Sequence, residues 1–267
     1  MSFAFRELEH SERHVLGALR CIDLTSGAAI EAALQVSADG ARLLRNRSGL
    51  YVILEWTGLA EHAADPNLQP KTLFLTVRDP AGRYLPRLVK VDLPRDPTPD
   101  NAGHADSLFR PTEAPMYPSP AAPVSANWAA LRMSVIEADN GDALGGALIR
   151  VLCDGATIAR GLTDWRGESL VLVAGIPFIT CAGNSSSESG SITVREIATS
   201  VEVCFDAALG TQVPMSDVRA GHQPAALPLV DPADLENDLG TLPMASIQIS
   251  LAAGRQYELS PMEITLP

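Results

Sequence analysis

Short runs of aliphatic and β-branched residues recur along the whole chain, and they constrain its fold more than any other feature. The runs are about four to eight residues long and are bounded by Gly, Pro, Asn or Asp, which is typical of β-strands joined by turns. Most of the 20 glycines and 20 prolines fall between the runs. We therefore predict an all-β protein. The expected strands cover residues 50–54, 72–77, 132–137, 147–152, 170–173, 192–194, 200–205, 246–251 and 263–266.

Two segments have a helical pattern instead. Residues 6–20 carry a moderately periodic set of apolar side chains. Residues 231–236 begin with Asp231, whose side chain can cap a helix, and continue with Pro232, which suits the first helical position. We predict a helix in each segment.

A proline-rich stretch divides the chain. Eight prolines fall between residues 94 and 123, and this density removes backbone donors and favours extended conformations. We predict that residues 96–127 connect two domains, the first over residues 1–95 and the second over residues 128–267. Apolar side chains indicate that the connector packs on a domain surface; they are Leu108, Phe109, Met116 and Tyr117.

An internal repeat supports this division. Residues 20–34 match residues 134–148, with Gly27 aligned to Gly141, and each copy continues through an Asp-Gly pair to a glycine before an apolar strand. Glycine supplies the positive φ that tight turns require. The offset of 114 to 118 residues is the size of one sandwich domain. We therefore predict two tandem β-sandwich domains joined by the proline-rich segment.

Two motifs in the second copy carry a family resemblance. Residues 140–147 read Asn-Gly-Asp-Ala-Leu-Gly-Gly-Ala, and residues 161–168 read Gly-Leu-Thr-Asp-Trp-Arg-Gly-Glu. Over about residues 130–205 this pattern resembles the carboxypeptidase regulatory-like domain family. The resemblance implies a prealbumin-like or immunoglobulin-like sandwich that serves as an accessory module without catalytic residues. The first copy departs from the pattern, because residues 46–49 read Asn-Arg-Ser-Gly where Thr-Asp-x-x-Gly is expected.

A second resemblance concerns the whole chain. Residues 46–52, 79–86 and 109–111 together resemble uncharacterised proteins of phage-tail-like contractile injection clusters. This resemblance implies a component of a released particle, assembled from protein subunits. We therefore expect a structural subunit or adaptor and no enzyme. The alternative is a carbohydrate- or surface-binding module, but aromatic residues make up only 5% of the chain, and sugar-binding platforms rely on them.

Charge and hydropathy exclude several partners. The formal net charge is −12, and residues 125–267 hold 17 acidic but only 7 basic residues. This balance argues against nucleic acid and anionic membranes as partners. No apolar run approaches the roughly 18 residues of a membrane span, so we expect no membrane insertion. Residues 1–7 lack the basic region and apolar core of a secretory signal peptide, so we expect synthesis in the cytoplasm.

The sequence carries no catalytic, phosphate-binding or metal-binding motif, and we predict no cofactor and no metal. His10 and His14 lack the HExxH pattern of zinc proteases, so a solvated helix face is favoured. Asp139, Asn140 and Asp142 offer oxygens to calcium, but an ordinary Asn-Gly turn is the favoured alternative.

The four cysteines form no CxxC pair. Cys21, Cys153 and Cys204 lie in strand-like segments, where a reduced cysteine behaves as a small apolar side chain. A disulfide between Cys181 and Cys204 is the alternative to reduced thiols, which suit a chain without an export signal.

Three features suggest an interface with a partner protein. Residues 50–54 and 170–173 are apolar on both faces, so either a partner or the proline-rich segment covers their outer face. Trp165 lies in a turn, where it is either packed back or presented to a partner. The aromatic N-terminal segment can add a strand to a partner's sheet. The candidate interface residues are Phe3, Phe5, Tyr51, Ile53, Trp165, Val171 and Val173.

Overall fold

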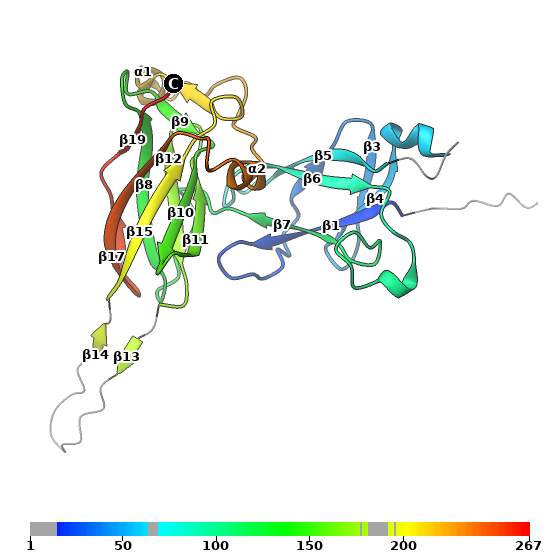
Figure 1. The fold of residues 1–267 in the computed structure, drawn as a ribbon, viewed down its shortest axis with the longest axis horizontal. Coiled ribbons are helices and arrows are strands. Elements are labelled where there is room, and N and C mark those ends of the chain that lie inside the picture. Colours follow the sequence, from blue (N-terminus) through cyan, green and yellow to red (C-terminus); the bar gives the residue numbers. More distant parts are fainter. Residues whose placement is uncertain (1–14, 64–68, 177, 181–191, 195) are drawn as a thin grey trace, which may run out of the picture. The chain divides into compact units, whose positions relative to one another are not determined.

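The chain folds mostly into β-strands, which confirms the predicted all-β class (Figure 1). The computed structural model describes residues 15–63, 69–176, 178–180, 192–194 and 196–267. The strands are β1 (Gly17–Asp23), β2 (Gln35–Ser37), β3 (Ala41–Arg45), β4 (Tyr51–Trp56), β5 (Lys71–Arg78), β6 (Arg87–Leu93), β7 (Thr112–Met116), β8 (Ala129–Glu137), β9 (Ala143–Gly145), β10 (Leu148–Cys153), β11 (Ala156–Leu162), β12 (Glu168–Val173), β13 (Phe178–Thr180), β14 (Ile192–Val194), β15 (Glu196–Cys204), β16 (Thr211–Val213), β17 (Met244–Ala252), β18 (Gln256–Glu258) and β19 (Met262–Ile264). The short helices are η1 (Thr57–Ala63), η2 (Pro99–Asn101), α1 (Met215–Ala220) and α2 (Pro232–Asn237).

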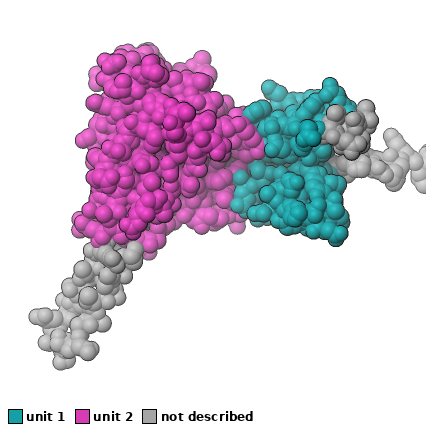
Figure 2. All heavy atoms as spheres, in the orientation of Figure 1, with its two compact units in different colours: residues 1–20, 37–74, 91–113 teal, residues 21–36, 75–90, 114–267 magenta. Residues whose placement is uncertain are grey.

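The chain forms two compact units, coloured separately in Figure 2. Unit 1 comprises residues 1–20, 37–74 and 91–113, and unit 2 comprises residues 21–36, 75–90 and 114–267. The chain therefore enters each unit more than once, whereas one continuous segment per domain was predicted from the sequence. The tandem domain arrangement stays a prediction.

Unit 2 contains a β-sandwich. One sheet has the strand order β11-β10-β15-β17, and the other has the order β12-β8-β9-β16, with β18 and β19 paired in parallel with β8. Fully buried side chains of both sheets share one core, for example Leu131 and Val171 from the second sheet and Ile149 and Val201 from the first. Burial of such side chains is the main source of the sandwich's stability.

The remaining strands form smaller sheets. One has the order β3-β4-β1-β7, another the order β2-β5-β6, and β13 pairs with β14. In the first, Leu19 of β1 and Ile53 of β4 are fully buried, while the residues next to them along each strand are half-buried or exposed. This alternation fits strands with one face turned to a core.

The two predicted helices had different outcomes. The helix at residues 231–236 is confirmed as α2, and the Asp231 carboxylate caps it by accepting a hydrogen bond from Ala233 N at 3.2 Å. The helix at residues 6–20 is wrong at its C-terminal end, because residues 17–20 begin β1 and pair with β4. Pairing and alternate burial outweighed a weak helical pattern there. Residues 6–14 lie outside the described residues.

The first turn of the predicted repeat has the same hydrogen bonds in both copies. Gly27 N donates to Asp23 O at 2.8 Å, and Gly141 N donates to Glu137 O at 3.0 Å. The side chains of Asp23 and Glu137 each accept further bonds from backbone N–H groups within their turn. The two glycines have φ of 70° and 74°, a conformation that favours glycine.

The second turn of the repeat also matches. Gly49 N donates to Asn46 O at 3.1 Å, and Gly167 N donates to Asp164 O at 3.0 Å. The Oδ1 atoms of Asn46 and Asp164 each accept bonds from two backbone N–H groups. The Asn46 side chain therefore stabilises its turn with the same two hydrogen bonds that the Asp164 side chain makes in the other turn.

The strands between these turns share their register as well. Leu19 of β1 lies opposite Tyr51 of β4, and Met133 of β8 lies opposite Ser169 of β12. These two pairs are related by the offsets of 114 and 118 residues found in the sequence. The repeat is therefore a structural one over two strands and two turns. The copies differ beyond it, because β3 pairs with β4 whereas β11 pairs with β10.

Candidate functional site

Strand β17 is an open edge of the sandwich in unit 2 (Figure 1). It pairs with β15 on one side, and β19 of the other sheet contacts it without pairing. Its sequence, Met-Ala-Ser-Ile-Gln-Ile-Ser-Leu-Ala, holds no charged residue and no proline. Natural sheets usually protect an edge with charges, prolines or bulges. Strand β17 has no charged residue and no proline, and its register with β15 is not interrupted by a bulge.

The register shows which backbone groups of β17 point away from the sheet. Phe205 N donates to Pro243 O, so the odd-numbered residues of β17 exchange hydrogen bonds with β15. The even-numbered residues therefore direct their N–H and C=O groups outward. Consistent with this, Ala252 N donates to the Tyr257 hydroxyl at 2.8 Å. The outward N–H groups of Ser246, Gln248 and Ser250 have no partner among the described residues.

The core-facing side of β17 is incompletely covered. Ala245, Ile249 and Leu251 pack against the sandwich core. Ile247 lies on the same face because side chains alternate along a strand, yet it is 37% exposed. The open edge therefore combines backbone groups that are unpaired among the described residues with a partly exposed apolar side chain.

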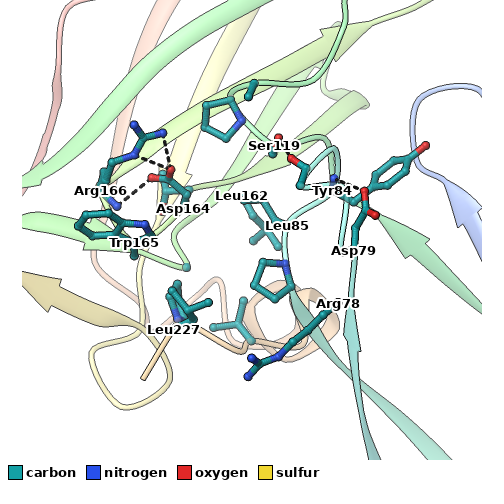
Figure 3. Close-up of a pocket in the computed structure, with 18 of the residues that line it drawn as sticks. Arg78, Asp79, Tyr84, Leu85, Ser119, Leu162, Asp164, Trp165, Arg166 and Leu227 are labelled. Atoms are coloured by element: carbon teal, nitrogen blue, oxygen red, sulfur yellow. Dashed lines mark hydrogen bonds and ion pairs between the residues drawn. The ribbon is translucent and has the colours of Figure 1, made fainter. Parts of the chain in front are cut away.

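A cavity of about 390 Å³ is the second candidate site (Figure 3). Every residue that lines it belongs to unit 2. Its apolar lining includes Leu85, Leu162, Leu227 and Val230, together with four prolines and the Trp165 ring. Figure 3 shows Trp165 and Arg166 on one side of the cavity and Arg78 and Tyr84 on the other.

A rigid turn holds Trp165 at this cavity. The Asp164 carboxylate accepts bonds from Arg166 N at 2.8 Å, Glu168 N at 3.1 Å and Arg166 Nε at 2.9 Å. The Thr163 hydroxyl donates to Leu144 O at 2.6 Å and accepts from Ala147 N at 2.9 Å. The backbone on both sides of Trp165 is thereby fixed.

The acidic groups at the cavity are already engaged. Asp79 accepts bonds from the backbone N–H groups of Ala81, Arg83 and Tyr84, and Asp164 is held as described. The Tyr84 hydroxyl donates to Asp23 Oδ2 at 2.9 Å, and burial together with this carboxylate raises the pKa of Tyr84 to about 12. Neither Arg78 nor the Trp165 indole N–H has a hydrogen-bond or ion-pair partner in the described part of the chain.

The predicted interface residues lie in different surroundings. Phe3 and Phe5 lie outside the described residues. Tyr51 and Ile53 are buried beside β1 and β3, and Val171 and Val173 are buried in the sandwich core. These four side chains have a packing role within the chain, and an interface role for them stays a prediction. Trp165 is half-buried at the cavity.

The outer face of β12 is covered by the chain itself. Leu170 and Leu172 pack with Ala122, Val124 and Trp128, which lie at the C-terminal end of the proline-rich segment or directly after it. For β12, this confirms the alternative in which the chain's own proline-rich segment covers the outer face of the strand. The covering segment is also anchored by a hydrogen bond from Arg132 Nη1 to Pro120 O at 2.6 Å.

The residues considered for calcium form an ordinary turn. Asn140 Oδ1 accepts a bond from Asp142 N at 2.7 Å, as in an Asn-Gly turn. Within the described ranges, no three His, Cys, Asp or Glu side chains gather as metal ligands would.

The cysteines lie mostly in strands. Cys21 and Cys204 are buried and Cys153 is half-buried, and burial raises the pKa of the Cys204 thiol to about 11. Cys181 lies outside the described residues, so neither the prediction of reduced thiols nor the alternative disulfide with Cys204 is tested for this pair.

Comparisons with known proteins assign no family to the chain. No family model matches it, and no curated protein matches it significantly. The structure contains, in its described part, no helix that is long and apolar enough to cross a membrane.

Trp165 was singled out from the sequence, but the cavity that it lines and the β17 edge were not predicted. The signal for the edge was available, since the nine residues of β17 carry no charge although they lie in a strongly acidic half of the chain. The cavity had no such signal, because its lining comes from segments between residues 35 and 230 that are distant in the sequence.

Proposed function

We propose that this chain is a structural subunit or adaptor that joins a protein assembly by accepting an extended segment of a partner at the β17 edge. The observation that carries the proposal is the run of outward N–H groups at Ser246, Gln248 and Ser250. An extended segment satisfies such groups by adding a strand to the sheet. Backbone hydrogen bonds then supply affinity, and side-chain pockets supply specificity.

The edge also indicates the chemistry of the partner segment. Every second side chain of an added strand faces the sandwich core, where it can cover Ile247. We therefore expect apolar residues at alternate positions of the segment. Residues 125–267 carry a net charge of −10, which favours a partner with basic residues beside that segment.

The class of assembly is proposed from the sequence. The resemblance to proteins of phage-tail-like contractile injection clusters suggests a particle component, and the resemblance to carboxypeptidase regulatory-like domains suggests an accessory module. Both agree with a strand-accepting subunit. A soluble particle is also favoured by the acidic surface of the second half, because like charges keep such complexes apart from one another.

The test compares two variants at one position in the native cells. Gln248→Pro removes an outward N–H group but no bond to β15, so the sheet keeps its ladder. Gln248→Ala is the matched control, since it keeps the N–H group. We expect the wild type and Gln248→Ala to sediment with large particles from native extract and Gln248→Pro to sediment as free chain.

Two results would contradict the proposal. If Gln248→Pro enters the particles as well as the control does, the β17 edge is not the docking site. If the wild-type chain is found only as a free monomer, the assembly role itself is wrong.

A further inference from the structure

The Trp165 cavity carries an inference that is independent of the β17 edge. Its volume of about 390 Å³ falls in the range of small-ligand sites, which is roughly 300–1,000 Å³. We propose that this cavity binds a small organic anion with a planar apolar body, such as an aromatic carboxylate or sulfonate.

The internal repeat shows that the turn does not need a tryptophan. Trp165 is the residue after Asp164, and Arg47 holds the equivalent position after Asn46 in a turn with the same hydrogen bonds. A bulky aromatic ring at this position is therefore not required to form the turn. Its placement at the cavity is an added feature of the second copy.

The turn also presents the ring in a fixed place. Asp164 ties down Arg166 and Glu168, and Thr163 ties the preceding strand to Leu144 and Ala147. A platform that is rigid before binding loses little conformational entropy when a ligand arrives. Trp165 can thus stack against a planar ring while Leu85 and Leu162 contact the ligand's other apolar surface.

The free hydrogen-bonding groups determine the charge of the ligand. Arg78 and the Trp165 indole N–H are donors without partners among the described residues, whereas Asp79 and Asp164 are already engaged. Because the donors at the cavity are unpaired and its carboxylates already accept hydrogen bonds, the cavity favours a ligand group that accepts hydrogen bonds and carries negative charge. Arg166 contributes less, because it pairs with both Asp164 and Glu168.

The test uses two dyes that differ in charge. One is 8-anilinonaphthalene-1-sulfonate, an anion with a planar apolar naphthalene ring, and the other is uncharged 1-anilinonaphthalene. Fluorescence titration of the full chain is expected to give one saturable site for the anionic dye. Sodium 1-naphthoate is expected to compete for that site.

Three variants locate the site. We expect Trp165→Ala to weaken both dyes by about 10-fold and Arg78→Ala to weaken only the anionic dye, by about 5-fold. Arg255→Ala, an exposed cation elsewhere in unit 2, is the matched control and is expected to change neither. Leu227 lines the cavity but lies outside the strands, so Leu227→Asp is expected to leave the sheets intact and to repel the anionic dye. This variant tests the site even if Trp165→Ala does not fold.

Several results would overturn the inference. Unsaturable binding that none of the variants changes would show that the cavity is not the site. An equal loss of both dyes in Arg78→Ala would overturn the assignment of an anion. Competition by a neutral oligosaccharide, with none by 1-naphthoate, would favour the carbohydrate-binding alternative instead.

Discussion

Arg87 and Asp231, which are 144 residues apart in the sequence, form an ion pair with 2.9 Å between Nη2 and Oδ1. Each side chain is only 7% exposed. The Arg87 guanidinium also donates to Pro115 O at 2.7 Å and to Leu88 O at 3.0 Å, and it lies 5.8 Å from the centre of the Tyr117 ring. This one side chain therefore joins β6, the end of β7 and the cap of α2.

Breaking this pair should destabilise the protein strongly. Arg87→Met leaves Asp231 buried without its counter-ion, and we expect a loss of about 3 kcal/mol or more in the free energy of unfolding. Asp231→Asn keeps a capping side chain but leaves the guanidinium uncompensated. Because the two groups stabilise each other, the double variant should lose less than the sum of the single variants, as measured by urea unfolding. Additive losses would show that the pair is not coupled.

The two glycines of the repeat should differ in their tolerance of alanine. Gly49 and Gly167 both have positive φ, of 78° and 73°. A Cβ at Gly49 would meet only Arg45 Nη2 at 3.6 Å, whereas one at Gly167 would lie 2.5 Å from Val135 O. We expect Gly49→Ala to cost about 1 kcal/mol and Gly167→Ala more than about 3 kcal/mol. Thermal and urea unfolding of the two variants gives the comparison, and equal losses would contradict this account.

The match between Asn46 and Asp164 predicts which substitution the second turn accepts. Asp164→Asn retains an oxygen for Arg166 N and Glu168 N, as Asn46 does in its own turn. Asp164→Ala removes that oxygen and should cost about 1–3 kcal/mol. We expect Asp164→Asn to cost clearly less when both are measured by urea unfolding. If the two variants are equally unstable, the shared turn geometry does not explain the role of Asp164.

Stability should fall on the alkaline side. Burial raises the pKa of Tyr117 and Tyr84 from 10.0 to about 12 and that of Cys204 from 9.0 to about 11. Between these values the unfolded chain releases protons that the folded chain retains, so the free energy of unfolding decreases as pH rises. We expect a plateau below pH of about 9 and a decline from there towards pH 12. In Tyr117→Phe the decline should be shallower, and an unchanged slope would contradict the assignment to Tyr117.

The sequence was enough for some features and not for others. Local signals predicted α2, because Asp231 and Pro232 act within one helical turn, and they predicted the repeat, because each glycine fixes its own turn. The first residues of β1 were predicted as helix, since pairing with β4 depends on residues that are more than 30 positions away. The division into units was not predicted, because strands such as β5 and β6 pass from one unit to the other.

The candidate sites show the same limit. Trp165 was singled out from its place in a turn, but its cavity also needs Arg78 and Leu227, which only the tertiary fold brings near. The open edge required the strand order, because an uncharged strand such as β17 reads like a central strand until its neighbours are known. The apolar strand at residues 170–173 suggested an interface with a partner, but other parts of the same chain cover both of its faces.

Hydrogen exchange at individual backbone amides of β17 is the most direct test of the strand-accepting edge. In the isolated chain we expect the amides of Ile247 and Ile249 to be protected by β15 and those of Ser246, Gln248 and Ser250 to exchange rapidly. In the assembly the latter three should become protected, because a partner strand accepts their hydrogen bonds. If they exchange as rapidly in the assembly as in the isolated chain, no strand is added at β17 and the central claim is wrong.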